Sequence, residues 1–515
     1  MSDETFDVAI IGYGPTGVTA ANLLGAMGHR VLVVEREADI YSRARAISTD
    51  EEVLRIWQTT GLVDRLKEDM LPERTTAFVD ADQRILGSVY PESKGHGHPP
   101  QSFIYQPALE QVLRDGVDRY PNVDIRLQHD SLKVRDTGGV VELLLHDIRQ
   151  DALVHASARY VIACDGGSSP TRGSLGIGFD GTTYEDRWVV IDTKMKKEWP
   201  NHDFLRFHCD PARPAVDCPT PLGHHRWEFP ILPGEDEAAL VSDEGVWRLL
   251  AGHGITPDNV DILRAVVYSH HVRFASQWRR GRIFLAGDAA HVMPPWIGQG
   301  MAAGVRDAAN LCWKLDAVLR GQLDVAVLDS YETERKPHVR EVTKRAVLVG
   351  RIITHRRTRT AKLRDLMLRL VNRSPRVMIG VQGRLWIPDA NYADSWNGGR
   401  SHDAVGHKIP QPTVIDDHGM DRLLDDALPS GWVILHTGNA PTDAAWNATA
   451  TVIRVAAAGA APAEGAVVDR DGTLHAWFDS HGAATVVLRP DRFVYDATAE
   501  SALMPCPLRP MGAVA

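Results

Sequence analysis

The chain has 515 residues, of which 44% are hydrophobic and 24% are charged, and 57 Lys and Arg stand against 67 Asp and Glu, a formal net charge of −10. This size and apolar content predict two to four well-cored structural units and exclude a chain that is mostly disordered. The negative balance argues against a surface for nucleic-acid phosphates, and no apolar stretch approaches the ~18 residues that cross a bilayer. We therefore expect a small-molecule partner, no nucleic acid and no membrane.

The first residues and the cysteines predict a cytoplasmic protein. Residues 1–5 are acidic and lead directly into a strand-like segment, without the basic and apolar regions of a signal peptide. The five cysteines are scattered and form neither a Cys-x-x-Cys pair nor a zinc-like cluster with His. We expect them to be reduced and structural, and we expect no metal site.

Residues 6–35 predict a β-α-β unit that binds a dinucleotide. An apolar strand at 6–11 precedes Gly12-x-Gly14-x-x-Gly17, a small-residue helix follows, and a second strand at 30–35 ends in Glu35. The glycines permit a tight turn and a close approach of backbone N–H groups to a pyrophosphate, and Glu35 can accept hydrogen bonds from ribose hydroxyls. A glycine-rich turn in an unrelated α/β protein is the alternative, and the strand–helix–strand context disfavours it.

A second site far along the chain indicates which dinucleotide is bound. The strand at 282–286 ends in Gly287-Asp288-Ala-Ala-His291, and an acid there can bond the ribityl hydroxyls that FAD has and NAD lacks. Residues 293–304 then combine prolines and glycines at the start of a helix predicted over 300–319. Such a turn can approach the pyrimidine end of an isoalloxazine and stabilise negative charge on it. The two sites together predict one FAD.

The remaining pattern predicts an α/β fold with further units. We expect a Rossmann-like FAD-binding domain at 1–180 and 275–345, with a polar surface excursion near 76–100. Alternating aromatic segments predict a mostly β substrate domain at 181–274, and a helical linker region follows at 346–400. A small α/β unit occupies 401–515. Its expected strands are 432–435, 451–455, 484–488 and 493–495.

Three motifs in this order resemble the FAD-dependent aromatic hydroxylases, the single-component flavoprotein monooxygenases. They are the glycine fingerprint with Glu35, residues 164–172 with the sequence Cys-Asp-Gly-Gly-Ser-Ser-Pro-Thr-Arg, and residues 287–291 with their Gly-Gln-Gly extension. Within that class the chain is most similar to 3-(3-hydroxyphenyl)propionate hydroxylases. This similarity is carried by residues 43–47, 105–110, 209–214 and 226–229. The C-terminal unit resembles the thioredoxin-like domain of the phenol hydroxylase branch.

The resemblance implies roles for individual residues. Arg45 and Gln106 would contact FAD, and Arg172 shares with Asp165 a motif implicated in both FAD and NAD(P)H binding. Many relatives have Asn where this chain has Ala302, so backbone contacts must replace one side-chain contact to the flavin. The residues expected to bind the cofactor are Gly12, Gly14, Pro15, Thr16, Gly17, Glu35, Arg36, Arg45, Gln106, Asp165, Asp288, Pro295, Gly298, Gly300 and Met301.

Two residues are candidates for the chemistry. By resemblance Arg226 faces the flavin and the substrate, but the pattern equally allows it to pair with Glu228 on a solvated sheet face. Asp50 could deprotonate a phenol, although capping of a helix that begins at Glu51 is the favoured interpretation.

Other residues leave alternatives open. Trp296 and Ile297 could line a ring-binding pocket or only pack their loop. The histidines near the expected substrate region, His208, His224 and His225, are interpreted as surface or core residues. The arginines of residues 351–359 are interpreted as a solvated helix face, with an anionic interface as the alternative. Cys506 is the one cysteine of the C-terminal unit, so that unit cannot cycle a dithiol.

The resemblance implies an enzyme that hydroxylates a phenolic ring. NAD(P)H would reduce FAD, O2 would add at C4a, and the resulting hydroperoxide would attack a ring made electron-rich by its hydroxyl. No second dinucleotide fold is visible, so the nicotinamide would bind transiently. The alternatives are a Baeyer–Villiger or polyketide-tailoring oxygenase, a flavin dehydrogenase or reductase that does not use O2, and a module that only binds an aromatic compound. A homodimer stays open.

Overall fold

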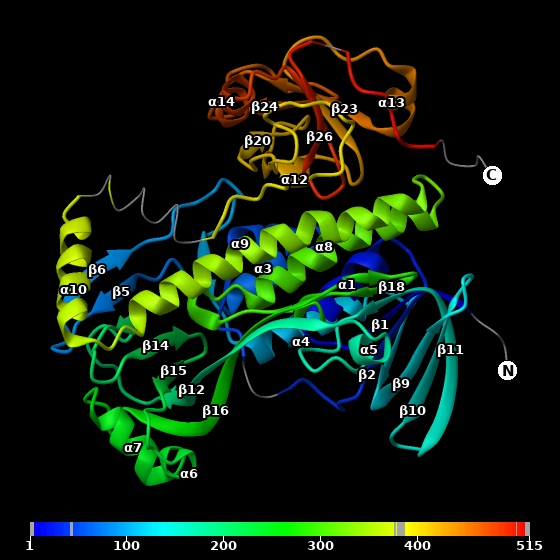
Figure 1. Cartoon of the computed structure of the whole chain (residues 1–515). Coiled ribbons are helices and arrows are strands. Elements are labelled where there is room, and N and C mark those ends of the chain that lie inside the picture. Colours follow the sequence, from blue (N-terminus) through cyan, green and yellow to red (C-terminus); the bar gives the residue numbers. More distant parts are fainter. Residues whose placement is uncertain (1–4, 42–44, 375–376, 378–386, 501, 510–515) are drawn as a thin grey trace.

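Two eight-stranded sheets and one seven-stranded sheet organise the part of the chain that the structure describes (Figure 1). This computed structural model describes residues 5–41, 45–374, 377, 387–500 and 502–509. The similarity segment at 43–47 therefore begins outside the described residues. No described helix is both long enough and apolar enough to cross a membrane.

The first sheet has a parallel centre. Its central strands are paired in the order β18-β11-β1-β2-β8. Their bounds are β1 (Thr5–Ile11), β2 (Val31–Glu35), β8 (Val123–Leu127), β11 (Ala152–Ala163) and β18 (Ile283–Leu285). Because the five strands run in one direction, the turns that follow β18, β11, β1 and β2 meet along one edge of the sheet.

Different layers cover the two faces of this sheet. Val8 and Ile10 point into the main core with the helices α1 (Pro15–Ala26), α4 (Gln106–Val117) and α8 (Gly300–Leu319). Ala9 and Ile11 point the other way, into a core shared with β9 (His129–Asp136) and β10 (Val141–Asp147), two antiparallel strands that continue the same sheet from β11. The strands are apolar on both sides because both faces are buried. The predicted strands at 6–11 and 30–35 and the predicted helix at 300–319 are confirmed.

The second sheet forms the expected mostly β region. Its strand order is β19-β16-β12-β15-β14-β13-β5-β6, with β12 and β16 paired along most of their length. One face packs on α6 (Glu237–Leu240) and α7 (Asp243–Ala251), and the other faces the first sheet. The strand bounds are β5 (Thr76–Val79), β6 (Ile85–Val89), β12 (Phe179–Met195), β13 (Leu205–His208), β14 (Ala215–Thr220), β15 (His224–Pro230), β16 (Val260–Ala275) and β19 (His291–Val292).

The prediction of a surface excursion near residues 76–100 is wrong. Its first half supplies β5, which pairs in parallel with β13, and β6 at the edge of the second sheet. Its second half is buried at His96 and His98. The loop is polar and yet buried because side chains from other parts of the chain form hydrogen bonds with its backbone. Glu51 accepts from the backbone N–H of His96 at 3.0 Å, and Gln411 donates to the His96 carbonyl at 2.7 Å.

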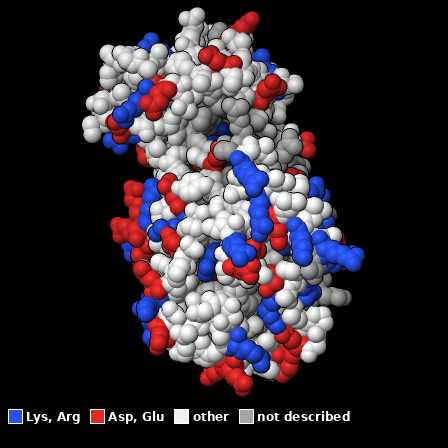
Figure 2. Space-filling view, turned by 90° about the vertical axis from the view of Figure 1, so that its left-hand side faces the viewer, with Lys and Arg blue, Asp and Glu red and all other residues white. Residues whose placement is uncertain are grey.

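Two helices follow the first sheet. They are α9 (Ser330–Ile353) and α10 (Thr358–Asn372). The first begins before the helical region predicted at 346–400 and ends in it, and the second lies inside it. Figure 2 views the molecule from the side on which α10 lies and shows Lys and Arg side chains over the middle of that face. Arg351, Arg356, Arg357 and Arg359 are exposed, as expected for a solvated face. Residues 375–376 and 378–386 of this region lie outside the described residues.

The C-terminal unit, residues 401–509 with the exception of 501, has its own sheet in the order β21-β20-β24-β23-β22-β25-β26. The four predicted strands are confirmed, and three others were not predicted. The bounds are β20 (Thr413–Ile415), β21 (Asp421–Leu423), β22 (Val433–His436), β23 (Thr451–Ala456), β24 (Ala466–Asp469), β25 (Thr485–Leu488) and β26 (Val494–Thr498). In Figure 1 this unit sits over α8 and α9. Trp432 and Tyr495 join the main core beside Trp313 and Trp396.

Candidate active site

A cavity of about 260 Å³ lies between the carboxyl edge of the first sheet and the inner face of the second. It collects residues from the glycine fingerprint, the two later FAD motifs and the segments at 43–47, 105–110 and 226–229, but none from residues 209–214. Those that line it are Gly14, Pro15, Thr16, Arg45, Gln106, Cys164, Gly166, Arg226, Glu228, Asp288, Pro295, Trp296, Ile297, Gly298, Gly300 and Met301. Apolar residues complete the wall: Ile47, Phe103, Leu205, Phe207, Val216, Val292 and Met293.

The glycine fingerprint forms the turn between β1 and α1. Gly12 has φ +97°, and a Cβ there would lie 2.5 Å from the carbonyl oxygen of Cys164. A Cβ on Gly17 would lie 2.0 Å from the carbonyl oxygen of Gly12, so only glycine allows the helix to start this close to the strand. At Gly14 a Cβ would meet nothing within 4 Å, because this backbone borders the open cavity.

The first turn of α1 presents unpaired backbone donors to the cavity. Gly14 is the N-cap residue and offers no side-chain hydrogen bond, and Pro15 opens the helix. The N–H groups of a first helical turn lack partners within the helix and carry partial positive charge. Pro15 and Thr16 line the cavity, so an anionic group placed there would be bound by these donors.

Glu35 lies at the end of β2, beside the fingerprint. Its Oε2 accepts from the Tyr13 N–H at 2.7 Å and its Oε1 from the Glu37 N–H at 2.8 Å. These bonds orient the carboxylate and leave each oxygen a second lone pair for a hydroxyl. Arg36 does not reach the cavity: its exposed side chain pairs with Glu37.

The turn after β11 is tied to the turn after β18. Asp165 accepts from the Ser169 hydroxyl at 2.5 Å and the Thr171 N–H at 3.0 Å, so it shapes the turn before α5 (Pro170–Ser174). Arg172 donates to the carbonyl oxygens of Gly167 at 2.8 Å and Ala289 at 2.9 Å. The two motifs, more than 100 positions apart in the sequence, are thus held together.

Asp288 follows β18 and faces the cavity. Among the described residues none donates a hydrogen bond to its carboxylate, and burial raises its pKa. The turn itself is fixed by Asp307 of α8, which accepts from the Gly287 N–H at 3.0 Å and from His291 Nε2 at 2.7 Å. The sequence prediction missed Asp307, although an acid on the apolar side of the predicted helix was its signal.

The loop before α8 closes the cavity. Pro295, Gly298, Gly300 and Met301 line it, and α8 starts without a side-chain cap, so its first N–H groups face the same space. Gly298 has φ +66°, and a Cβ there would lie 2.1 Å from the hydroxyl oxygen of Ser48. Both interpretations of Trp296 hold, since it lines the cavity and packs edge-on against Trp188.

Gln106 shapes the segment that carries Arg45. Its Oε1 accepts from the backbone N–H groups of Arg45 and Ala46, each at 2.7 Å, and its Nε2 donates to Glu110 at 2.7 Å. Both Gln106 and Arg45 line the cavity. The structure therefore adds a positioning task for Gln106 to the cofactor contact that was predicted.

Arg226 and Glu228 lie side by side on the cavity face of β15. Arg226 is 4% exposed, so the interpretation of a solvated sheet face is wrong. Its Nε donates to Asp192 Oδ1 at 2.7 Å and its Nη1 to the Arg45 carbonyl at 2.9 Å. Asp192 also pairs with Arg264 on the next strand. Two guanidinium groups, those of Arg226 and Arg264, share the one carboxylate of Asp192. Burial would raise the pKa of Asp192, but these two positive charges hold it below its usual value.

Glu228 was not predicted to act on its own. It is buried, lines the cavity, and accepts no hydrogen bond from a described residue. Burial raises its pKa, although the charge of Arg226 opposes the shift. The alternation of β15 was the available signal, because it places Arg226 and Glu228 on one face and Trp227 and Phe229 on the other.

Asp50 does not reach this cavity. Its Oδ1 accepts from the N–H groups of Glu52 and Val53 at 3.1 Å, which confirms it as the cap of α2 (Glu51–Gln58). Its Oδ2 accepts from Gln299 and Arg306 at 3.0 and 2.7 Å. Both oxygens are occupied, so the candidate role of Asp50 as a substrate base is wrong and the favoured interpretation as a helix cap is confirmed.

The three histidines of the substrate region have structural partners. His208 and His225 are buried and bond to Asp217 at 2.7 and 2.9 Å, where Arg206 also donates. His224 stacks on Tyr105 with ring centroids 4.1 Å apart. The interpretation as core or surface residues is supported. None of the three lines the cavity of about 260 Å³, whereas His224 and His225 line a neighbouring cavity of about 410 Å³.

The cavity edge fits FAD in its donor and acceptor groups. Two uncapped helix N-termini, at Gly14 and Gly300, offer N–H groups for a pyrophosphate and for the pyrimidine end of a flavin. Two carboxylates, Glu35 and Asp288, offer acceptors for ribose and ribityl hydroxyls. The open space at Gly14 admits close contact with the backbone.

Comparison with known proteins agrees with this geometry. Residues 5–346 match the sequence family described as the FAD binding domain, and residues 406–506 match the HcaD C-terminal domain. A protein of Mycobacterium avium named 3-(3-hydroxy-phenyl)propionate/3-hydroxycinnamic acid hydroxylase is 36% identical, over 96% of this chain and 90% of the relative. A protein of the same name from Burkholderia cenocepacia is 36% identical, over 95% and 93%.

A solved structure shares the whole architecture. The anhydrotetracycline hydroxylase OxyS of Streptomyces rimosus superposes with a TM-score of 0.76 at 25% identity, over 96% of each chain. The match therefore includes the C-terminal unit as well as both large sheets. The chain belongs to the FAD-binding-domain family of flavoproteins, as an FAD-dependent aromatic hydroxylase.

Proposed function

We propose that the protein hydroxylates a single-ring phenol that carries a short acidic side chain, next to the existing hydroxyl, with NAD(P)H and O2 as co-substrates. The observation that carries this proposal is the pair Arg226 and Glu228, which face an apolar cavity at the flavin edge. The names of the relatives from Mycobacterium avium and Burkholderia cenocepacia support a hydroxyphenylpropionate or hydroxycinnamate. The other residues predicted to bind FAD keep their proposed roles, with the exception of the exposed Arg36.

The apolar walls suit an aromatic ring and exclude water. Leu205, Phe207 and Val216 come from the second sheet, Phe103 comes from a small three-stranded sheet, and Met293 directly follows β19. Water exclusion strengthens every charge interaction in the cavity and protects reactive species from hydrolysis. Bound FAD supplies the redox chemistry, since it accepts a hydride from a nicotinamide and activates O2.

Glu228 can take the proton of the phenol. A phenolate ring is more nucleophilic than a phenol, and hydroxylation beside the oxygen needs that electron density. The raised pKa of Glu228 brings it closer to the working pH than an ordinary carboxyl, and its oxygens are free of other described partners. Arg226 lies two residues before Glu228 in β15, on the same face of the strand. It provides the positive charge that stabilises the phenolate.

A polyketide-tailoring role is the second candidate. The names of the relatives at 36% identity favour a single-ring phenol over a fused polycycle. The similarity to an anhydrotetracycline hydroxylase keeps the second candidate worth testing.

The test is a substrate panel with isotopic oxygen. We expect 3-(3-hydroxyphenyl)propionate and 3-hydroxycinnamate to stimulate NAD(P)H oxidation and O2 uptake, and the product to gain one 18O atom from 18O2 on the ring. The matched control is 3-phenylpropionate, which lacks the hydroxyl and should not be hydroxylated. A ring-expanded or ester product would indicate oxygen insertion, and turnover with an artificial acceptor but without O2 uptake would indicate a dehydrogenase.

A further inference from the structure

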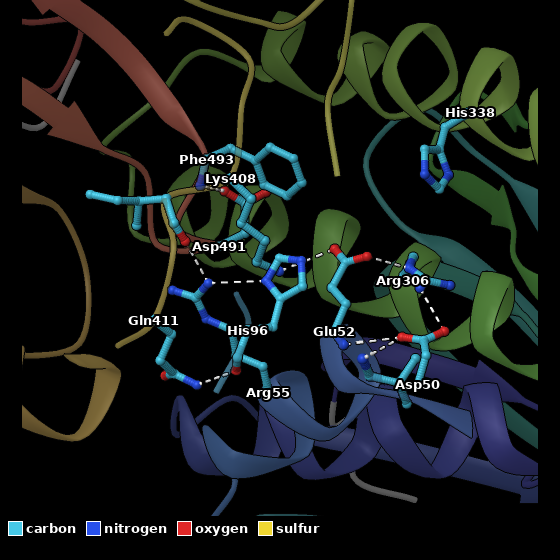
Figure 3. Close-up of polar contacts among 12 residues, drawn as sticks. Asp50, Glu52, Arg55, His96, Arg306, His338, Lys408, Gln411, Asp491 and Phe493 are labelled. Atoms are coloured by element: carbon cyan, nitrogen blue, oxygen red, sulfur yellow. Dashed lines mark hydrogen bonds and ion pairs between the residues drawn. The ribbon is translucent and has the colours of Figure 1, made fainter. Parts of the chain in front are cut away.

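A buried chain of charged groups joins the C-terminal unit to the loop that closes the cavity (Figure 3). Lys408 Nζ donates to Glu52 Oε1 at 3.2 Å, and Arg306 Nε donates to Glu52 Oε2 at 2.5 Å. Arg306 then donates from Nη2 to Asp50 at 2.7 Å and from Nη1 to Gln299 Oε1 at 3.0 Å. Gln299 Nε2 completes the set with a bond to Asp50 at 3.0 Å. We call these five residues the buried relay.

The charges of the buried relay balance one another. Lys408, Glu52, Arg306 and Asp50 are each at most 8% exposed, and two cations face two anions. Burial would raise the pKa of Glu52, but Arg306 and Lys408 hold it well below its usual range. Burial lowers the pKa of Lys408, and Glu52 opposes that shift. Removing one charge would leave its partner buried and uncompensated.

The far end of the buried relay lies in the loop that forms part of the cavity wall. Gln299 stands between Gly298 and Gly300, which both line the cavity. Its side chain donates to Asp50 and accepts from Arg306, so the relay determines where this backbone lies. Gly298 adopts φ +66°, and a glycine backbone depends on such outside contacts to keep one conformation.

The other end of the buried relay, at Lys408 in the C-terminal unit, lies beside further contacts between that unit and α2, the helix that carries Glu52. Arg55 of α2 forms two hydrogen bonds to Asp425, at 2.7 and 2.9 Å, and a third to the Ile409 carbonyl at 2.6 Å. Lys408 itself lies 5.1 Å from the ring centroid of Phe493. In Figure 3 Glu52 lies between Arg306 and the part of the C-terminal unit that carries Lys408 and Phe493. These contacts fix the position of Lys408 and its surroundings relative to α2.

We propose that Lys408 is a positioning residue for the flavin-facing loop at residues 298–300, and that it acts through Glu52, Arg306 and Asp50. The C-terminal unit, which has no dithiol, would thus contribute to the flavin site by holding one wall of it. The inference does not depend on which phenol is the substrate.

The primary test measures the loop in the apoprotein by hydrogen–deuterium exchange. The Gly298 amide bonds to the Pro295 carbonyl and the Ala303 amide to the Gln299 carbonyl, so both report on the loop. In Lys408→Met we expect faster exchange at residues 298–303 and unchanged exchange at the fingerprint turn, residues 12–18. FAD titration should show a dissociation constant raised about fivefold or more, the usual lower range of coupling between sites.

The matched control is Asp426→Ala. Asp426 accepts a hydrogen bond from Gln58 at 2.7 Å, so its removal also takes one charge and one contact between the C-terminal unit and α2, but outside the relay. We expect loop exchange and FAD affinity to stay at the wild-type values in this variant. Equal effects of Lys408→Met and Asp426→Ala would overturn the proposal, because general weakening of the junction would then explain both.

A double variant separates the relay from a folding defect. Glu52→Gln keeps the shape of the side chain, and a cavity of about 330 Å³ beside Glu52 and Arg306 leaves room for readjustment. Combined with Lys408→Met it restores charge balance, so the double variant should bind FAD no more weakly than Glu52→Gln alone. Additive losses, or wild-type loop exchange in a folded Lys408→Met protein, would refute the coupling.

Discussion

The carboxylates near the cavity differ in what already occupies their oxygens. One oxygen of Asp50 accepts from backbone N–H groups at the start of α2, and the other accepts from Gln299 and Arg306. Glu35 is oriented by two backbone N–H groups. Glu228 and Asp288 face the cavity without a described hydrogen-bond donor. Residue type alone therefore does not assign a role, and the free lone pairs decide which acid meets a ligand.

Replacement of Glu35 by Ala should weaken FAD binding. The loss of charge-assisted hydrogen bonds to the ribose predicts roughly 1–3 kcal/mol. FAD titration of the apoprotein measures this loss. Glu37→Gln is the control, because Glu37 is an exposed neighbour that pairs with Arg36 and should leave FAD affinity unchanged. Wild-type affinity in Glu35→Ala would remove Glu35 from the ribose site.

Glu228→Gln should lower kcat by roughly 10²–10⁴-fold, the usual contribution of a positioned base. A base works when deprotonated, so wild-type kcat should fall as the pH drops through the pKa of Glu228. Burial places that pKa above the ordinary value of a glutamate, so the fall should begin at a higher pH. The pH profile of the variant should lack this acidic limb. An identical limb in both proteins would assign it to another group.

Arg226→Lys should retain the fold and FAD but lose the fixed geometry to Asp192 and the Arg45 carbonyl. We expect slower flavin reduction or a larger share of peroxide in place of product, which stopped-flow reduction and a peroxide assay measure. Arg264→Lys is the matched control, since Arg264 bonds the same carboxylate but does not line the cavity that Glu228 and Asp288 face. Normal rate and coupling in Arg226→Lys would leave Arg226 with a structural task only.

Strand ends and strand alternation build the site at the scale of elements. Four neighbouring parallel strands end at one edge, so motifs far apart in sequence become adjacent. The alternation of β15 turns Arg226 and Glu228 inward, and β16 carries buried His270 against Trp188 and Trp296. The second sheet thus supplies both the polar pair and the aromatic support of the flavin-facing loop.

The buried His270 should make the protein less stable in acid. Burial lowers its pKa to about 4, whereas an unfolded histidine titrates near 6.5. Between these values the unfolded chain binds the extra proton, so this residue lowers the free energy of unfolding as the pH falls below 6.5. His270→Phe keeps the ring and removes the titration. Between pH 7 and pH 5 its stability should fall by about 2 kcal/mol less than that of the wild type in urea unfolding. Parallel curves would contradict the assignment.

At the scale of the molecule, the seven-stranded sheet of the C-terminal unit packs against the core of the other two large sheets. Its aromatic residues Trp432 and Tyr495 merge with the main core, and the buried relay adds polar contacts to α2 and α8. The C-terminal unit is therefore a structural part of the enzyme rather than a tethered module.

A redox task for the C-terminal unit is not expected. Cys506 is its one cysteine, and its sulfur lies 3.3 Å from the Thr449 hydroxyl. Cys506→Ser should leave the hydroxylation rate and the coupling to NAD(P)H oxidation unchanged. A large loss of activity in a folded, FAD-loaded variant would revive the redox role. The comparison of rates with equal FAD content makes that distinction.

The sequence by itself determined the parts that depend on local spacing. Gly12, Gly14 and Gly17 between a strand and a helix, and Asp288 at the end of another strand, predict a flavin site because turn geometry and helix starts require those residues at those positions. The helix at 300–319 and four C-terminal strands follow from periodicity, which is also local.

Only the tertiary structure decided which side chains share the cavity and which are occupied elsewhere. Asp50 and Arg306 are 256 positions apart, and Glu52 and Lys408 are 356 positions apart, so no local pattern announces their pairing. Residues 76–79 were predicted to lie in a surface excursion, but they form β5, which pairs with β13. Long-range pairing satisfies hydrogen bonds and charges that a local pattern leaves open. For that reason only the tertiary structure shows that Gln299 and Arg306 occupy the second oxygen of Asp50, that Glu228 is a free acid in the cavity, and that Lys408 pairs with Glu52.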